Sequence, residues 1–425
     1  MNILLIRPRP HKDTIGLQSV MICEPLELMQ LSSVLKQNGH VVNIIDMIIE
    51  KKPVDYFVKK FNPDVLGITG YISHVGVIKD YAKKIKLCSK DIKVLVGGVH
   101  AKVCPEDFID ENIDYVCRSA DDFYDFSRCK VRKNILPDRE ITKKYQNMYY
   151  YLFQRKCALI KTSFGCPYNC NFCFCKEISS YSARQIDDVI REIKTISQEE
   201  IYIVDDDFLF NRKRLLEFYQ KLKENDIHKH YLVYGRADFI SKNEDIIEKL
   251  KEVGLSAVIV GIEASSQEEL DSYNKNVQID DNVEAIRILR KHNIECYATV
   301  ILGIDWGKSD FKRLYNFIKK NRLVFVNLQP FTPMPRTPYF DEYKNKLIIP
   351  YDEHEKWDMA HLVVKPGKLS IRAYYYQIIS LYYKITMSPK NIIYMIKRYS
   401  LKTVMMLSCG ALAITWQYIK KIIKG

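Results

Sequence analysis

The sequence lacks the features of a secreted protein. Its first seven residues form an apolar stretch that is too short for the hydrophobic core of a signal peptide and is typical of a strand. The cysteines outside one short loop show no pairing pattern, so a disulfide framework is not indicated. The sequence therefore predicts a reducing, cytoplasmic setting.

Acidic residues are missing from the C-terminal part of the chain. Residues 359–425 contain no Asp or Glu and eleven Lys or Arg, which account for most of the net charge of +13. Residues 403–419 are uncharged, and as a helix they would be about 25 Å long, at the lower limit for crossing a bilayer. Ser408 and Gln417 favour a helix that lies in the membrane interface, where basic flanks and aromatic residues suit an anionic leaflet. A helical cap with a basic outer face is the alternative, and nucleic acid is the less favoured partner.

The chain does contain a close group of cysteines. Cys166, Cys170 and Cys173 follow the spacing Cys-x3-Cys-x2-Cys. Structural zinc takes four ligands, whereas a four-iron cluster held by three thiolates leaves one iron open for another ligand. A zinc site with Cys175 as the fourth thiolate is the alternative, but it would crowd all four ligands into ten residues.

The cysteine loop also resembles a known family. Residues 162–173 read Thr-Ser-Phe-Gly-Cys-Pro-Tyr-Asn-Cys-Asn-Phe-Cys and look like the cluster loop of radical S-adenosylmethionine (SAM) enzymes. The resemblance implies that the three cysteines hold a [4Fe-4S] cluster whose open iron binds SAM. It also implies that a reducing electron donor drives cleavage of SAM to a 5′-deoxyadenosyl radical. Phe172 matches the aromatic residue that commonly precedes the last cysteine.

Residues 1–130 alternate short strands with helices. Strands are predicted at 3–6, 41–45, 65–69, 94–96 and 115–117, and a helix at 24–37. This order predicts a parallel, doubly wound, Rossmann-like sheet, whose ligands bind beyond the carboxyl ends of the strands. No Gly-x-Gly-x-x-Gly follows the first strand, which disfavours a dinucleotide.

Two glycine-rich loops of this sheet resemble those of a cobalamin-binding domain. Residues 96–101 read Val-Gly-Gly-Val-His-Ala, and their place ahead of the cysteine loop matches the domain order of cobalamin-dependent radical SAM enzymes. Small residues let a large cofactor approach the backbone. A lone loop histidine, however, is more often a hydrogen-bonding surface residue. The residues predicted to contact cobalamin are Thr69, Gly70, Tyr71, Ser73, Gly97, Gly98, Val99 and His100.

Two departures from the family pattern bear on the cobalamin prediction. The Asp-x-His-x-x-Gly that supplies a histidine to cobalt in many other cobalamin proteins is absent, so cobalamin would bind without a histidine from that motif. Where the family often has Gly-Glu-Gly-Glu, residues 119–122 read Ser-Ala-Asp-Asp, which keeps the acidity and loses the glycines. A domain that no longer binds cobalamin is the alternative, since such sheets survive the loss of a ligand.

The second half of the chain is organised in the same alternating way. Residues 131–155 are polar and rich in tyrosine and predict a linker, and 346–425 predict a helical region. Between them, at 156–345, we expect a partial (β/α)6 barrel of the TIM type. Its strands are predicted before the cysteine loop and at 201–204, 231–234, 257–260, 298–302 and 324–328, and its helices at 185–196, 214–225, 244–253 and 282–292.

Polar residues just after the barrel strands are the candidates for SAM contacts. Asp205 and Asp206 lie where the family binds the SAM amino group, although consecutive Asp residues are also typical of a solvated turn or a helix cap. Arg236 is expected to clamp the SAM carboxylate, and Glu263 to accept the ribose hydroxyls. For these two residues a salt bridge across the barrel mouth is the alternative. Ile301 resembles the apolar strip under the adenine.

Taken whole, the chain is most similar to the hopanoid C-3 methylase branch of the cobalamin-dependent radical SAM enzymes, through its domain order and short motifs at 24–28, 304–306 and 357–363. The resemblance implies a C-methyltransferase that acts on an unactivated carbon of a hydrophobic or lipid substrate by way of the 5′-deoxyadenosyl radical and methylcobalamin. No general acid or base is predicted, because the cofactors carry the hard chemistry. One alternative is a cobalamin-binding radical SAM enzyme that forms rings, couples carbons or oxidises without methyl transfer. The other is a non-catalytic zinc or membrane-associated binding protein.

Overall fold

A computed structural model of the chain describes residues 1–16, 20–131 and 135–424, which form two compact units. The first unit takes in the described chain up to Tyr149, except Val20 and Met21, which belong to the second unit, and in addition the later segment Pro350–Asp358. The second unit takes in Tyr150–Ile349 and the chain from Met359 onward. Residues 132–134 of the predicted linker lie outside the described part, and a 3-10 helix, η3 (Glu140–Met148), occupies much of the rest of it.

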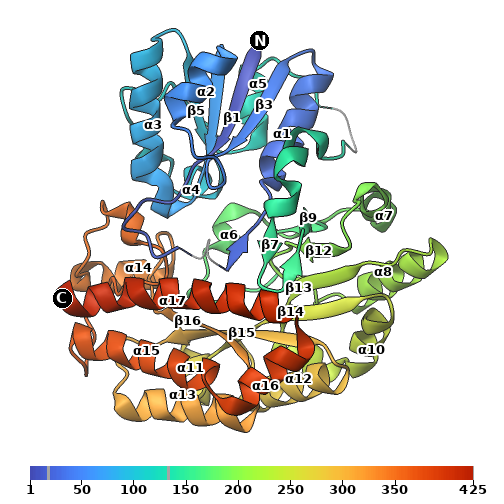
Figure 1. The fold of residues 1–425 in the computed structure, drawn as a ribbon, viewed down its shortest axis with the longest axis vertical. Helices are drawn as coiled ribbons and strands as arrows, with labels where there is room; N and C mark the ends of the chain where they lie inside the picture. Colours follow the sequence, from blue (N-terminus) through green and yellow to red (C-terminus); the bar gives the residue numbers. More distant parts are fainter. Residues whose placement is uncertain (17–19, 132–134, 425) are drawn as a thin grey trace. The chain divides into compact units, whose positions relative to one another are not determined.

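The first unit is built on a five-stranded parallel sheet in the order β3-β1-β4-β5-β6. Figure 1 labels β1, β3 and β5 of this sheet. Leu4 and Ile6 pack on one face against α2 (Val54–Phe61) and α3 (Val75–Cys88). Ile3 and Leu5 pack on the other face against α1 (Leu26–Gln37) and α5 (Ala120–Phe126). Both faces are covered, so the doubly wound sheet that the continuous apolar runs predict is confirmed. The strands are β1 (Asn2–Arg7), β3 (Val41–Asp46), β4 (Val65–Thr69), β5 (Lys93–Gly97) and β6 (Tyr115–Val116).

The second unit is a six-stranded parallel sheet in the order β9-β12-β13-β14-β15-β16. Helices alternate with the strands along the chain, which confirms the partial (β/α)6 barrel (Figure 1). The strands are β9 (Ala158–Ile160), β12 (Glu200–Ile203), β13 (His230–Arg236), β14 (Leu255–Glu263), β15 (Glu295–Leu302) and β16 (Phe325–Pro330). The principal helices between them are α7 (Ile186–Thr195), α8 (Arg212–Glu224), α10 (Glu244–Glu252), α12 (Ile279–Lys291) and α13 (Lys308–Lys320).

The cysteine loop extends from this barrel between two short strands that pair with each other. Its base is the antiparallel pair β10 (Ser163–Phe164) and β11 (Ser182–Ala183). Gly165 has a φ of +67°, and a Cβ there would lie 2.4 Å from the carbonyl oxygen of Ser179. Glycine is therefore required where the two sides of the loop approach each other.

The C-terminal region is helical, as predicted, and consists of α15 (Ile371–Thr386), α16 (Pro389–Arg398) and α17 (Leu401–Lys424). Tyrosines of α15 attach it to the barrel. The buried Tyr374 hydroxyl donates to the carbonyls of Leu302 and Gly303, each at 2.9 Å, and the Tyr382 hydroxyl accepts from the Leu328 amide at 2.9 Å. Among the described residues, no helix is long and apolar enough to cross a membrane.

Candidate active site

The cysteine loop forms one part of the candidate site. Cys166, Cys170 and Cys173 are all partly buried. Burial raises the pKa of Cys166 to about 11 and also raises that of Cys170, so each remains a neutral thiol until a metal displaces its proton. Cys175 forms a side-chain hydrogen bond with Cys173, and its Sγ lies 3.9 Å from Oδ1 of Asp206.

A distant segment holds the loop in position. The Asn171 amide donates to the Tyr273 carbonyl at 3.0 Å, and the Asn274 side chain donates to the carbonyl of Asn169 at 3.0 Å. The ring of the predicted site residue Phe172 packs edge-on against Tyr273, with centroids 5.6 Å apart. These partners follow α11 (Gln267–Ser272), far along the chain, and no local sequence pattern identifies them.

The three aspartates after β12 have three different environments. Asp205 is buried and accepts hydrogen bonds from the Thr162 amide at 2.6 Å, the Thr162 hydroxyl at 2.5 Å and the Ser163 hydroxyl at 2.7 Å. It therefore anchors the start of the cysteine loop. Asp206 is partly exposed and lies 3.5 Å from the Lys161 ammonium. Of the two predicted SAM contacts, Asp206 is the one with an accessible carboxylate.

Asp207, which is not among the predicted SAM contacts, is the most unusual of the three. Its side chain is buried, yet no side chain of the described residues donates a hydrogen bond to either carboxylate oxygen, and the Leu209 amide acts on it only weakly. Burial raises the pKa of Asp207 to about 8, although the charges of Arg236 and Lys275 act in the opposite direction. A buried carboxylate without a donor suits a cationic ligand, because such a ligand would supply the missing partner.

Arg236, at the end of β13, reaches the cysteine loop. Its guanidinium lies 3.8 Å from the ring centroid of Tyr168, and Nη1 lies 3.9 Å from the Sγ of Cys170. Nε pairs with Asp238 at 3.0 Å, and Nη2 donates to the Lys275 carbonyl at 2.6 Å. The predicted residue is thus beside the cluster loop, and its ion pair is with a near neighbour in sequence.

Glu263 and Ile301 lie at the carboxyl ends of the next two strands. Glu263 has a φ of 58° at a register shift of β14 and pairs with the buried Lys275 ammonium at 2.8 Å. In the structure Glu263 and Arg236 therefore have separate ion-pair partners. Ile301 is buried on β15. The predicted roles of these residues toward SAM remain predictions.

In the first unit, the predicted cobalamin loops follow β4 and β5 and contact each other. The Gly70 amide donates to the Gly97 carbonyl at 3.3 Å. Gly98 has a φ of +101°, and a Cβ there would meet the Thr69 hydroxyl oxygen at 2.6 Å. Tyr71 is exposed, and Ser73 and Val99 are partly exposed. The loops therefore offer a glycine-lined, uncharged surface that suits a large, flat cofactor.

His100 differs from the other predicted cobalamin residues. Its ring is buried, and Nε2 lies 2.7 Å from Oδ2 of Asp107. The side chain is thus engaged inside the protein. Contact between His100 and cobalamin remains a prediction, and it would involve the backbone of His100 and not its ring.

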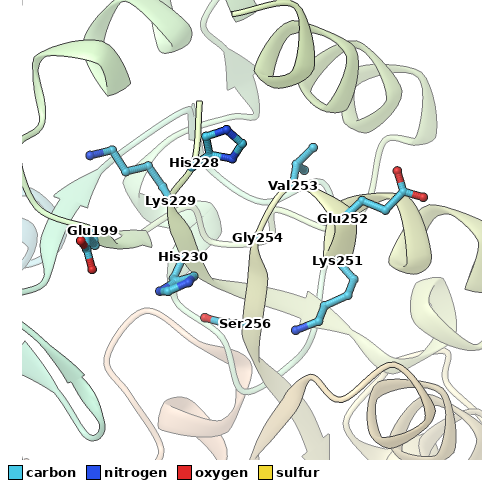
Figure 2. A pocket seen from close by; sticks show the side chains of 9 residues that line it. All are labelled: Glu199, His228, Lys229, His230, Lys251, Glu252, Val253, Gly254 and Ser256. Carbon is cyan, nitrogen blue, oxygen red and sulfur yellow. The ribbon is translucent and has the colours of Figure 1, made fainter. Parts of the chain in front are cut away.

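A polar hollow of about 500 Å³ lies elsewhere on the second unit. Figure 2 shows it between His228, Lys229 and His230 on one side and Lys251, Glu252 and Val253 on the other. These residues precede or begin β13 and β14, so the hollow lies at the amino ends of the strands. Barrel enzymes place their chemistry at the carboxyl ends, and we do not assign the reaction to this hollow.

Comparison with known families agrees with both loops. The Radical SAM superfamily matches residues 160–318, which include the three cysteines and Asp207. The B12 binding domain matches residues 13–123, which include both glycine-rich loops. The chain combines a radical SAM domain with a B12 binding domain. The [4Fe-4S] cluster, SAM and cobalamin are therefore its cofactors, and the zinc-protein alternative is set aside.

Individual relatives of this enzyme span most of its length. The hopanoid C-3 methylase of Methylococcus capsulatus is 23% identical over 89% of this chain and 79% of its own. The anaerobic magnesium-protoporphyrin IX monomethyl ester cyclase of Cereibacter sphaeroides is 22% identical over 87% of this chain and 68% of its own. The solved structure of OxsB, a cobalamin-dependent SAM radical enzyme, has 14% identity and a TM-score of 0.70 over 98% of this chain and 71% of that one. This last likeness supports the fold.

Proposed function

We propose that this enzyme transfers a methyl group from SAM to an unactivated carbon of a hydrophobic substrate. The observation that carries the proposal is the pairing of a B12 domain with a radical SAM domain in a chain that is similar to a hopanoid methylase along most of its length. When bound, the cluster with SAM supplies radical chemistry and cobalamin carries a methyl group. The protein's own residues bind, orient and exclude water.

Within this proposal, some residues at the barrel mouth bind the cluster and others bind SAM. Cys166, Cys170 and Cys173 would hold the cluster. Asp206 and the buried Asp207 would face the positive charge of SAM, because no side chain of the described residues donates a hydrogen bond to Asp207. Asp205 would act indirectly, since its hydrogen bonds hold the start of the loop.

Ring formation is the second candidate function. It is favoured by the similarity to the magnesium-protoporphyrin cyclase, which covers 87% of this chain. That reaction class would use the same two cofactor units and leave the substrate without an added methyl group. The two candidates therefore predict different product masses.

The deciding experiment supplies the anaerobically reconstituted enzyme with cobalamin, a chemical reductant and SAM that carries a deuterated methyl group. Hydrophobic extracts of cells that lack the enzyme serve as the substrate source. Methyl transfer predicts a product about 17 Da heavier than its precursor, since CD3 replaces H. A product that lacks the label and has lost hydrogen would establish the cyclase candidate and overturn methyl transfer.

We further propose that the C-terminal helices bring the enzyme to an anionic membrane surface where a lipid substrate resides. Leu401, Met405, Leu412 and Trp416 of α17 are each more than half exposed, and their spacing puts them on one face of the helix. The opposite face is buried through Tyr418, which packs against Tyr375 of α15. The apolar face lies in a region that has basic residues and no acidic ones.

Vesicle co-sedimentation tests the membrane proposal. The double variant Leu412→Glu, Trp416→Glu should bind anionic vesicles at least about tenfold more weakly than the parent, because two apolar anchors are lost. The matched control is Leu87→Glu, which changes a residue 79% exposed on α3 of the first unit and should leave binding unchanged. Equal binding by the double variant and the parent would leave α17 as a cap of the barrel and nothing more.

A further inference from the structure

A buried cluster of metal-ligand side chains lies in the first unit, apart from the glycine-rich surface. His100 lies on α4 (Val99–Val103), and Asp107 lies on the 3-10 turn η2 (Pro105–Phe108). His354 comes from the segment Pro350–Asp358, which we call the returning segment because it follows the barrel in sequence and belongs to the first unit. The two imidazole nitrogens and a carboxylate oxygen all lie within 4.8 Å of one another.

The hydrogen bonding of this cluster is incomplete. Oδ2 of Asp107 accepts from the Tyr351 hydroxyl at 2.6 Å and lies 2.7 Å from His100 Nε2 and 3.4 Å from His354 Nε2. His354 is 9% exposed as a residue, and its Nε2, which faces Asp107 at 3.4 Å, meets good hydrogen-bond geometry with no atom of the described residues. A buried imidazole nitrogen whose contact with a carboxylate is long and poorly aligned gains little from it, and a bound cation would use both groups more fully.

The dimensions of the cluster suit a small cation. Zinc bonds of about 2.0–2.1 Å in a tetrahedral site place neighbouring ligand atoms roughly 3.3 Å apart. The separation of 3.4 Å between Asp107 and His354 already has this value. The pair His100 and Asp107, at 2.7 Å, would open by about 0.6 Å when a metal replaces the shared proton. Tyr351 would then orient the ligating carboxylate from outside the metal shell.

We propose that His100, Asp107 and His354 bind a divalent cation of the zinc class, which fastens the returning segment to α4 and η2. Two imidazoles and one carboxylate are a ligand set that zinc accepts. The cobalt of cobalamin does not fit this position, because both rings are buried and a corrin is far too large to reach them. The cation is a structural ligand, separate from the cluster and from cobalamin.

The returning segment is also held by contacts that need no metal. The Thr14 hydroxyl donates to the Glu355 carbonyl at 2.8 Å, and the Ile15 amide donates to the Asp358 carboxylate at 2.6 Å. Trp357 is buried beside them. The segment therefore docks without metal, and the cation would raise its stability by preferring the docked state.

The test is metal analysis of the full-length holoenzyme after exchange into buffer with a slight excess of Zn²⁺ and removal of loosely bound metal. We expect about one zinc per chain in addition to cluster iron. The same stoichiometry is expected in a variant whose cysteines 166, 170, 173 and 175 are all alanine, because the thiolate site is then removed. Zinc should also raise the melting temperature of this variant.

Single substitutions in the four-alanine variant locate the site. His354→Ala should weaken zinc binding by at least about 100-fold and abolish the zinc-dependent rise in melting temperature, since a ligand is lost. His11→Ala is the matched control, because His11, Asp13 and Glu355 form a second and more exposed cluster in the same unit. Zinc retained by His354→Ala, zinc lost in His11→Ala, or no zinc in the parent would each overturn the proposal. In the absence of metal, the His354→Gln variant should have the same melting temperature as the parent. Loss of zinc binding in that variant then reflects loss of a ligand and not loss of the fold.

Discussion

Each unit ends its parallel strands in loops that suit a cofactor, but the two sets of loops differ in chemistry. The edge of the first unit is formed by glycines, Thr69 and an exposed tyrosine, and it offers backbone groups and no charged side chain from the predicted set. The edge of the second unit presents thiols, carboxylates and the guanidinium of Arg236. The same architecture therefore suits a large cofactor through backbone shape and a charged one through side-chain chemistry.

The difference also appears in how each edge is held together. Gly98 lets two backbone loops touch, so the first edge depends on the absence of side chains. The second edge depends on a chain of hydrogen bonds and ion pairs that runs from Asp205 to the cysteine loop and from Arg236 to Lys275. Substitutions should therefore damage the first edge by adding atoms and the second by removing polar ones.

The largest effect is expected at the charged edge. Replacing Cys166, Cys170 and Cys173 with alanine should abolish cluster iron and all turnover, since no open iron remains for SAM. Iron and sulfide analysis together with the product assay measure both outcomes. Cys175→Ala is the control and should keep its iron. Loss of iron in that variant would mean that Cys175 is a fourth thiolate ligand.

The second prediction concerns the anchor of the cysteine loop. Asp205→Ala leaves the buried Thr162 amide without its acceptor and should destabilise the second unit by about 2–4 kcal/mol. Thermal unfolding and cluster content should both fall. The matched control is Asp206→Ala, which removes the neighbouring, partly exposed carboxylate and should leave unfolding close to that of the parent. Equal melting of both variants would show that the anchor has no energetic role.

The third prediction concerns Asp207 and pH. Its folded-state pKa of about 8 lies above the ordinary value of 3.8, so the folded protein holds a proton that the unfolded chain releases between these values. The stability of the cofactor-free protein should therefore fall as the pH rises from about 4 to about 8. Asp207→Asn removes this contribution, and its melting temperature relative to the parent should rise by roughly 5 °C from about pH 5 to about pH 8.

Addition of SAM provides a second comparison between the parent and Asp207→Asn. SAM should stabilise the parent more than Asp207→Asn, because its positive charge satisfies the buried carboxylate. Asp206→Asn serves as the control for the pH series and should show no comparable trend. Equal stabilisation of the parent and Asp207→Asn by SAM would remove Asp207 from the SAM site.

The smallest effect is expected at the uncharged edge. Gly98→Ala places a Cβ 2.6 Å from the Thr69 hydroxyl oxygen at a φ of +101°, and should weaken cobalamin binding by about tenfold. Absorbance titration with cobalamin measures the change. Gly39→Ala is the control, because Gly39 also has a positive φ but has no atom within 4 Å of its added Cβ. Loss of cobalamin binding in both variants would trace the effect to general destabilisation of the first unit.

Much of the fold was predictable because its signals are local. The run of apolar residues in β1 and its counterparts indicates strands buried on both faces, and the alternation of strands with amphipathic helices indicates parallel sheets. Cysteine spacing predicted in the same way a loop that could hold a cluster, and the binding of a cluster by these three cysteines stays a prediction. The sequence did not show which of the C-terminal aromatic side chains are buried. Tyr374 of α15 is buried on the barrel, whereas Trp416 of α17 is exposed.

The sequence by itself determined two α/β units, a three-cysteine loop and a pair of glycine loops, since each of these depends on neighbours a few residues apart. Tertiary structure decided how each aspartate is held: Asp205 accepts hydrogen bonds from Thr162, whereas no side chain of the described residues donates to Asp207. It also brought His354 to His100 and Tyr273 to Phe172. Such pairings arise from packing between segments far apart in the chain, and no short pattern encodes them.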